Sequence, residues 1–195
     1  MNATGYKILE DFDGKYREFE ITSVREKDAL SIMRWRNAQI DALRQRDPLT
    51  EEQQLRYFRE VLLPTFPMER PPMVILAYLK QDKLIGYGGL VHLDWEAKRG
   101  EVSFLLDPSR IEDKQSYGRE FGNFLILLKH LAFNHLELNR VQTEAYGNRP
   151  WHVQTIEANG FRPEGVLRQH VWKGDQWVDA HLHACLRKEF EKNGF

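Results

Sequence analysis

One amphipathic segment in the middle of the chain, with strand-like segments on both sides, constrains the fold more than any other feature of the sequence. Its apolar side chains recur at helical spacing, which places them on one face of a helix: Phe121, Phe124, Leu125, Leu128, Leu131 and Ala132. Residues 101–106 before it and 140–146 after it have the pattern of β-strands instead. A helix placed between strands indicates a mixed α/β fold.

The other periodic segments extend this order in both directions. Further strand patterns occupy residues 18–24, 73–79, 84–93, 166–172 and 177–186. Helix patterns occupy residues 28–35, the segment from the capping box at Thr50 to Pro64, and the segment from Pro150 to Gly160. We predict an α/β fold with a twisted mixed sheet of about six to seven strands flanked by about four helices. It forms a single domain over residues 18–190, after a polar lead-in over residues 1–17.

Composition excludes several classes of protein. The chain is 42% hydrophobic and 29% charged, an ordinary globular balance, and its net charge of -1 gives no general reason to bind nucleic acid or anionic membrane. The longest apolar run, residues 124–128, is too short to span a bilayer. The single cysteine, Cys185, excludes an intrachain disulfide. We therefore expect a cytoplasmic protein that acts on neither nucleic acid nor membrane.

Three segments, taken in order, resemble the GNAT superfamily of N-acetyltransferases. They are residues 84–108, the stretch Ser116-Tyr117-Gly118-Arg119-Glu120-Phe121, and residues 156–168 around Asn159-Gly160-Phe161. The resemblance implies the GNAT acyl-CoA N-acyltransferase fold and an enzyme that moves an acetyl group from acetyl-CoA to a primary amine. The branches it resembles acetylate ribosomal-protein N-termini or amino sugars, so the implied acceptor is a protein N-terminus, an amino sugar or another small amine.

The resemblance also places acetyl-CoA at the start of the central helix, near Tyr117-Gly118-Arg119. A helix N-terminus offers unpaired N–H groups and a partial positive charge, which suit the pyrophosphate of CoA. The family's phosphate loop usually has Gln or Arg where this chain has Asp113, and Gly where it has Ser116. The strand before the helix would pair with the pantetheine arm, and Asn148 or Arg149 would contact it. The implied cofactor-binding residues are Phe104, Leu105, Leu106, Gln115, Ser116, Tyr117, Gly118, Arg119, Asn148 and Arg149.

Acetyl transfer requires a neutral amine, whereas a free alkylamine has a pKa near ~10. A base is therefore needed, and we consider two glutamates, Glu144 and Glu101. The alternation of a strand puts Glu144 on one face with Tyr146, and puts Glu101 on one face with Ser103. We expect both glutamates to face one polar cleft, and the sequence leaves open which of them is the base.

The family's usual general acid is a tyrosine four residues before the Gly-Phe pair, and this chain has Ile156 there. Tyr146, Tyr117, Ser103 or a water remain as proton donors, or the thiolate departs unaided. The resemblance places the acceptor mouth at Trp35, Arg36 and Asn37.

The sequence also allows a second interpretation of the function. A non-catalytic acyl-CoA-binding module is the alternative, because Ile156 cannot donate a proton and the phosphate loop is altered. We expect no metal, since His181, His183 and Cys185 lie too far apart along one strand for a single ion. The near-neutral charge disfavours a polyamine acceptor, and family analogy makes a homodimer the expected assembly.

Overall fold

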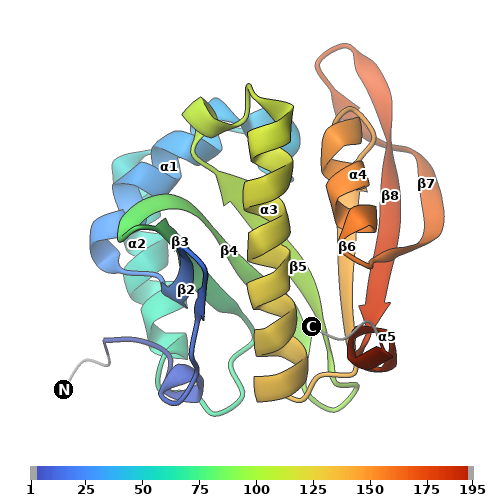
Figure 1. The fold of residues 1–195 in the computed structure, drawn as a ribbon. Helices are drawn as coiled ribbons and strands as arrows, with labels where there is room; N and C mark the ends of the chain where they lie inside the picture. Colours follow the sequence, from blue (N-terminus) through green and yellow to red (C-terminus); the bar gives the residue numbers. More distant parts are fainter. Residues whose placement is uncertain (1–3, 193–195) are drawn as a thin grey trace.

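The computed structural model describes residues 4–192, which form one mixed sheet with helices on both of its faces (Figure 1). The sheet of the described residues has eight strands in the order β1-β2-β3-β4-β5-β6-β8-β7. Only β5 and β6 pair in parallel among these neighbours. The strands are β1 (Lys15–Tyr16), β2 (Phe19–Ser23), β3 (Val74–Lys80), β4 (Lys83–Asp94), β5 (Arg99–Leu106), β6 (Arg140–Tyr146), β7 (Arg162–Lys173) and β8 (Gln176–Leu186).

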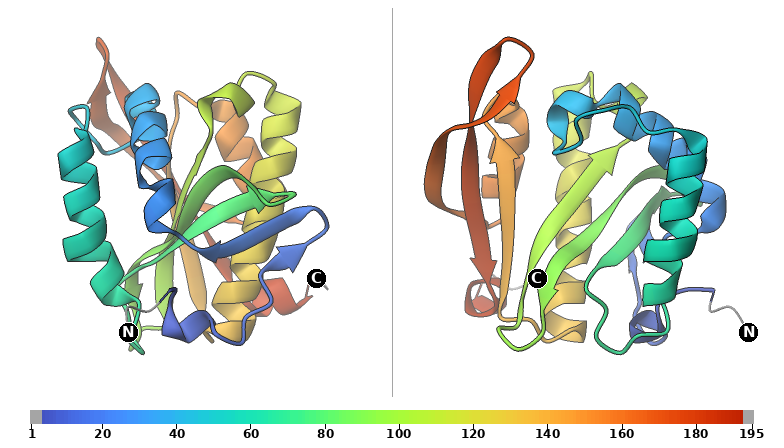
Figure 2. Two further views of the ribbon diagram at one scale, coloured as in Figure 1. Left: turned by 90° about the vertical axis from the view of Figure 1, so that its left-hand side faces the viewer. Right: turned by 180° about the vertical axis from the view of Figure 1, so that it is seen from behind.

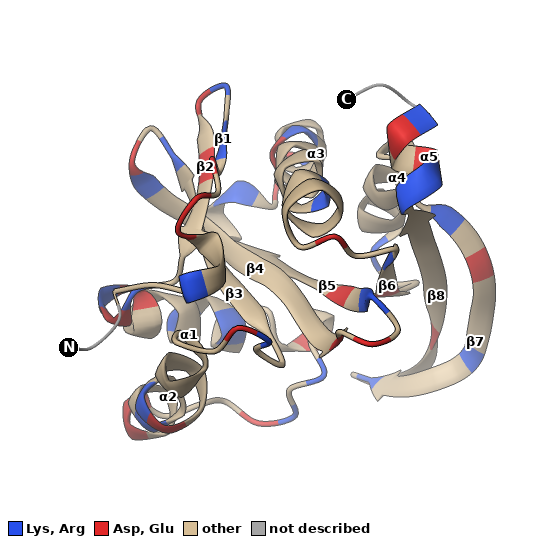
Figure 3. Cartoon of the chain, turned by 90° about the horizontal axis from the view of Figure 1, so that it is seen from below, with Lys and Arg blue, Asp and Glu red and all other residues tan. Residues whose placement is uncertain are grey.

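Five α-helices accompany the sheet: α1 (Ala29–Ala38), α2 (Glu51–Tyr57), α3 (Lys114–Lys129), α4 (Pro150–Ala158) and α5 (Arg187–Lys192). Helices α1 and α2 lie on one face, and α3 and α4 lie on the other (Figures 2 and 3). The predicted mixed α/β fold is confirmed, with slightly more strands than expected. No helix of residues 4–192 is long and apolar enough to cross a membrane.

The central helix packs as its periodicity predicts. Phe121, Phe124 and Leu128 of α3 are buried against the sheet. The ring of Phe121 stacks on Phe104 of β5, with centroids 4.3 Å apart. Because Phe104 points to the α3 face, its strand neighbours Glu101 and Ser103 lie on the opposite face, beneath α1 and α2.

Two local predictions have different outcomes. The capping box at the start of α2 is confirmed, because Thr50 and Gln53 each accept a hydrogen bond from the other's backbone N–H. Helix α3, however, begins at Lys114 rather than near Tyr117. The reason is Asp113, whose carboxylate caps the helix by accepting from the Gln115 N–H at 3.0 Å and the Ser116 hydroxyl at 2.6 Å.

The N-terminal segment contributes to the core. Tyr6 is 2% exposed, and its hydroxyl accepts a hydrogen bond from the Ile75 N–H at 3.0 Å. Lys15 and Tyr16 then pair with β2 at the edge of the sheet. The described part of the predicted polar lead-in is therefore folded onto the same sheet as the rest of the chain.

The parallel pair β5–β6 separates after only three residue pairs. The ladder joins Arg99 with Arg140 and ends at Glu101 with Gln142. Beyond these residues the two strands diverge toward the end that carries α4 and the start of α3 (Figures 1 and 2). This separation opens the middle of the sheet, and the candidate site lies there.

Candidate active site

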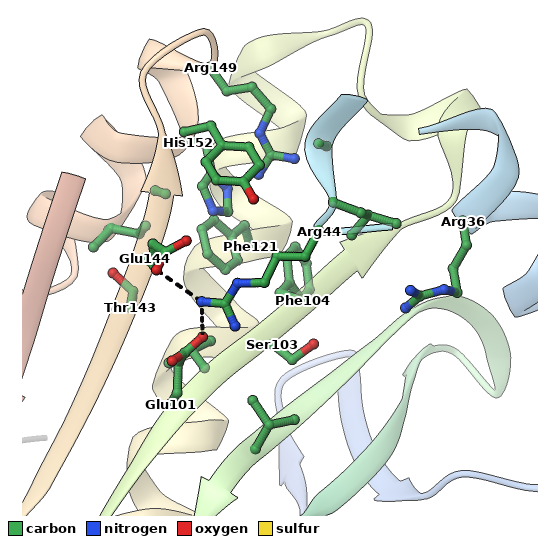
Figure 4. Close-up of a pocket in the computed structure, with 17 residues that line it drawn as sticks. Arg36, Arg44, Glu101, Ser103, Phe104, Phe121, Thr143, Glu144, Arg149 and His152 are labelled. Atoms are coloured by element: carbon green, nitrogen blue, oxygen red, sulfur yellow. Dashed lines mark hydrogen bonds and ion pairs between the residues drawn. The ribbon is translucent and has the colours of Figure 1, made fainter. Parts of the chain in front are cut away.

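A cavity of about 190 Å³ lies where β5 and β6 separate (Figure 4). Glu101, Ser103 and Phe104 of β5 line one side, and β6 lines the other with Thr143, Glu144 and Tyr146. The segment after α1, together with α3 and α4, completes the wall. The cavity therefore connects the two faces of the sheet.

The two candidate bases face this cavity together. Glu101 and Glu144 lie on adjacent strands, and their side chains are 14% and 15% exposed. One guanidinium nitrogen of Arg44 lies 2.9 Å from a Glu101 oxygen and 3.0 Å from a Glu144 oxygen (Figure 4). Two carboxylates on separate strands thus meet at one point, as the strand alternation predicts, and they share a single cation. Which of them acts as base stays a prediction.

Arg44 lies in the segment between α1 and α2, and its side chain is 52% exposed. It also lines a larger open groove of about 680 Å³ between that segment and the β7–β8 hairpin. Glu144 and Tyr146 line both spaces. Arg44 therefore stands at the boundary between the inner cavity and the outer groove. Burial and the nearby Glu144 raise the pKa of Tyr146, so its phenol is protonated at neutral pH.

On the α3 side of the cavity, a histidine occupies a position that the sequence analysis missed. His152 of α4 lines the cavity, and its ring stacks on Phe121 with centroids 4.5 Å apart. Its Nδ1 lies 2.6 Å from the hydroxyl of Tyr117. Burial, then the charge of Arg149, lowers the pKa of His152 well below its ordinary value, so the ring is neutral at pH 7. Burial raises the pKa of Tyr117 to about 12, so its phenol also stays protonated at pH 7.

The predicted cofactor residues lie in four different places. Phe104 and Arg149 line the cavity, whereas Leu105 and Leu106 are buried in the sheet beside it. The sequence left open whether Asn148 or Arg149 faces the site. Asn148 is exposed, and Arg149 is the one that lines the cavity. The remaining predicted cofactor residues lie on the first turns of α3, outside this cavity: Gln115, Ser116, Tyr117, Gly118 and Arg119.

The start of α3 is not a vacant anion site in this conformation. The Asp113 carboxylate occupies it, and hydrogen bonds from Ser116 and from backbone N–H groups lower the pKa of Asp113. Gly118 lies inside the helix, where a methyl group would meet the Thr155 hydroxyl at 3.4 Å. Arg119 reaches back to the Ser116 hydroxyl at 3.3 Å. This terminus combines donors with a fixed negative charge.

The three residues predicted at the acceptor mouth have different surroundings. Arg36 lines the cavity and donates to the Tyr87 hydroxyl at 2.7 Å and to Gln45 at 2.9 Å. Asn37 holds the backbone of Leu49, and Trp35 packs against the core. Only Arg36 of the three contributes to the cavity wall.

Three polar contributors to the cavity escaped the sequence analysis: Arg44, Thr143 and His152. His152 precedes Ile156 by four residues, one helical turn, so the same helix face carries both. That spacing was the available signal. Arg44 lies between helices, where no periodicity predicts the direction of its side chain. Thr143 has the strand pattern of an ordinary core position.

The side chains of His183 and Cys185, which were considered as metal ligands together with His181, have protein surroundings in the structure. His183 is buried beside Glu157, at 3.2 Å, and Cys185 is buried in the core. Within residues 4–192, no group of three His, Cys, Asp or Glu side chains is arranged to hold a metal ion.

A mixed sheet whose parallel central strands separate over a cavity is the architecture expected of the GNAT acyl-CoA N-acyltransferase fold. The model of the acetyltransferase (GNAT) domain family matches residues 21–182, and the chain belongs to this family of acetyltransferases. The uncharacterized N-acetyltransferase p20 of Bacillus licheniformis is 23% identical over 110 residues. That match spans 56% of this chain and 58% of p20.

Solved structures share the fold at low sequence identity. A mutant of the spermidine N-acetyltransferase SpeG from Vibrio cholerae has a TM-score of 0.73 at 15% identity, over 91% of this chain and 99% of that one. SpeG in complex with CoA and spermine has a TM-score of 0.73 at 16% identity, over 89% and 98%. A probable acetyltransferase has a TM-score of 0.69 at 19% identity, over 95% and 98%.

Proposed function

We propose that the protein is an N-acetyltransferase that moves the acetyl group of acetyl-CoA to a primary amine by direct attack. The observation that carries the proposal is the meeting of Glu101 and Glu144, from two strands, at a cavity where the sheet opens. Acetyl-CoA, when bound, supplies the thioester whose acyl carbon the amine nitrogen attacks as the carbon–sulfur bond breaks. The glutamates take up the proton that the amine must lose.

Two features of the described residues fit a pantetheine arm in this cavity. After Glu101, no ladder joins β5 to β6 within the described chain, so this edge of β5 has backbone groups available for the amides of the arm. The Thr143 hydroxyl is buried in the cavity wall and has no hydrogen-bond partner in the described structure. A buried hydroxyl without a partner is costly, and a ligand amide would satisfy it.

The charges around the cavity support a monoamine as acceptor. Arg36, Arg44 and Arg149 line the cavity with only Glu101 and Glu144 as carboxylates. Several ammonium groups would meet an excess of positive charge there, so a polyamine is disfavoured even though SpeG, a spermidine acetyltransferase, shares the fold. We propose a protein N-terminus, an amino sugar or another small monoamine.

Release of the free CoA thiol, measured with a panel of amines, tests this function. The panel holds a peptide with a free N-terminus, an amino sugar, a simple alkylamine and spermidine, each matched with its N-acetylated form as control. We expect turnover with at least one monoamine and with no acetylated control. Binding of acetyl-CoA without turnover on any amine would contradict the proposal and would favour a non-catalytic acyl-CoA-binding module.

The assembly is a separate proposal. Edge strand β7 and the adjoining hairpin expose Val166, Leu167, Trp172 and Trp177, each at least 38% exposed. Exposed apolar side chains on an edge strand favour self-association. We expect a homodimer, and light scattering with size-exclusion chromatography measures its mass. A monomer at all concentrations would contradict it.

A further inference from the structure

We propose that Arg44 is a displaceable occupant of the acceptor's ammonium subsite, and that the acceptor reaches this subsite through the outer groove. This inference rests on the proposed function and goes further by assigning an entry route and a residue that controls acceptor affinity. The guanidinium of Arg44 contacts both candidate bases through one nitrogen, at 2.9 Å and 3.0 Å. A substrate ammonium would need to occupy the same point to lose a proton to either carboxylate.

Arg44 lines both the inner cavity of about 190 Å³ and the outer groove of about 680 Å³, together with Glu144 and Tyr146. An amine that enters from the groove therefore meets Arg44 and Glu144 before it reaches Glu101. The inner cavity also contains the unpartnered Thr143 hydroxyl, a second and independent sign that this space is built for a ligand.

The Arg44 side chain is 52% exposed, and ion pairs at exposed positions contribute little net stability. Arg44 can therefore leave the carboxylates at small cost, and an incoming ammonium replaces one positive charge with another. The segment that carries Arg44 is anchored nearby, because Lys173 of the β7–β8 hairpin donates to the Leu43 and Ile40 carbonyls at 2.5 Å and 3.2 Å. The backbone thus stays in place while the side chain moves.

Displacement has a measurable consequence. When only a fraction of molecules has the subsite open, the apparent affinity for the acceptor falls by that fraction. Substituting Arg44→Ala opens the subsite permanently. We expect the KM for the acceptor to fall about three- to tenfold while kcat changes by less than about threefold, the range that a weak ion pair allows. Arg46→Ala is the matched control, because Arg46 lines the same groove without contacting either glutamate in the described structure.

A binding experiment tests the subsite without acetyl transfer. Methylguanidinium, the end group of the missing side chain, is titrated by calorimetry into wild type, Arg44→Ala and the triple variant Arg44→Ala/Glu101→Gln/Glu144→Gln. We expect saturable binding to Arg44→Ala, about three- to tenfold weaker binding to wild type, and at least tenfold weaker binding to the triple variant. Circular dichroism and acetyl-CoA binding confirm that each variant is folded.

Two outcomes would overturn the proposal. Equal methylguanidinium binding by Arg44→Ala and the triple variant would show that the carboxylates do not form a cation subsite. A loss of kcat in Arg44→Ala that methylguanidinium restores would show that Arg44 is needed during turnover and is not displaced. Failure of every amine in the panel would contradict the proposed function, whereas the methylguanidinium titration would still decide the subsite.

Discussion

Two charged clusters in this molecule differ in their ratio of carboxylates to cations. Within α3, one carboxylate, Glu120, serves two cations: Arg110 Nε donates to it at 2.8 Å and Lys80 Nζ at 3.3 Å. At the cavity, one cation, Arg44, serves two carboxylates, Glu101 and Glu144. The Glu120 side chain is 3% exposed, whereas Arg44 is 52% exposed.

The different ratio of carboxylates to cations indicates that one cluster stabilises the fold and that the other belongs to the candidate site. The charge of Glu120 is matched from two sides and enclosed, so no room or charge remains there for a ligand. At the cavity, two carboxylates meet at one half-exposed arginine, with the His170 ring 3.6 Å from Glu144, and that point opens on a groove. We infer that Glu120 stabilises the fold and that the cavity pair is available for chemistry.

The strongest test of this comparison is the removal of charge from the cavity pair. Substituting Glu101→Gln and Glu144→Gln singly should lower kcat/KM by about 10²- to 10⁴-fold in the variant that loses the base, because general base catalysis contributes that much. The other variant should lose less. The measurement is the rate of CoA release against pH, in which loss of the base also removes the acidic limb of the profile. Unchanged rates in both variants would exclude glutamate as the base.

The second test applies the same substitution to the buried cluster. Glu120→Gln should destabilise the fold by about 3 kcal/mol, and lower Tm by roughly 6–12 °C, because it leaves two cations without their enclosed partner. Urea unfolding measures this loss. Glu101→Gln is the control and should cost less than about 1 kcal/mol. Equal losses in the two variants would break the distinction between the clusters.

The same cluster also predicts acid sensitivity. Burial alone would raise the pKa of Glu120, but hydrogen bonds and charge from Arg110 and Lys80 outweigh it, so the net shift is downward. A carboxyl whose pKa is lowered in the folded state contributes stability above its unfolded pKa, about 4.3, and loses it as the pH falls through the folded pKa. In Glu120→Gln, this part of the acid dependence should disappear.

A third test concerns His152, a buried group at the same cavity. Because its pKa is lowered in the fold, the unfolded chain binds its proton first, and stability should fall as the pH drops below about 6.5. The slope from this residue approaches about 1.4 kcal/mol per pH unit. His152→Asn keeps a hydrogen-bonding group beside Tyr117 and should flatten the slope between pH 5 and 6.5, as measured by urea unfolding. An unchanged slope would show that folding does not lower the pKa of His152.

Local patterns in the sequence predicted which face of a strand or helix each side chain lies on, because that face depends only on the spacing of nearby residues. Period two put Glu101 and Glu144 on the faces where they are found, and helical spacing identified the buried face of α3. Arg44 was not predictable in this way, because its contacts join an irregular segment to strands 57 and 100 residues further along the chain, and no local spacing encodes such a contact. The start of α3 was misplaced because Asp113 was compared with a loop position, when its side chain also has the chemistry of a helix cap.

The smallest expected effect lies at Asp113, a third carboxylate, which has no cation within ion-pair distance in the described structure and caps α3 instead. CoA carries a pyrophosphate, and the negative charge of Asp113 stands at the helix terminus where that anion is expected. Asp113→Asn keeps the capping geometry, since Asn and Asp are equivalent caps, and removes the charge. We expect CoA to bind about three times more tightly, with Tm within about 2 °C of wild type.

Salt and a second variant decide the cause of this effect. If charge repulsion is responsible, the gain in CoA affinity measured by calorimetry should shrink at high ionic strength, because exposed charges are screened there. Asp113→Ala removes the cap as well as the charge, so it should lose stability without gaining more affinity than Asp113→Asn. Weaker CoA binding by Asp113→Asn would mean that the carboxylate itself orients Ser116 or Arg119 toward the cofactor. Asp113 would then be a functional carboxylate, like Glu101 and Glu144 at the cavity. In that case the burial of a carboxylate and the number of its cation partners would not be enough to separate structural from functional carboxylates.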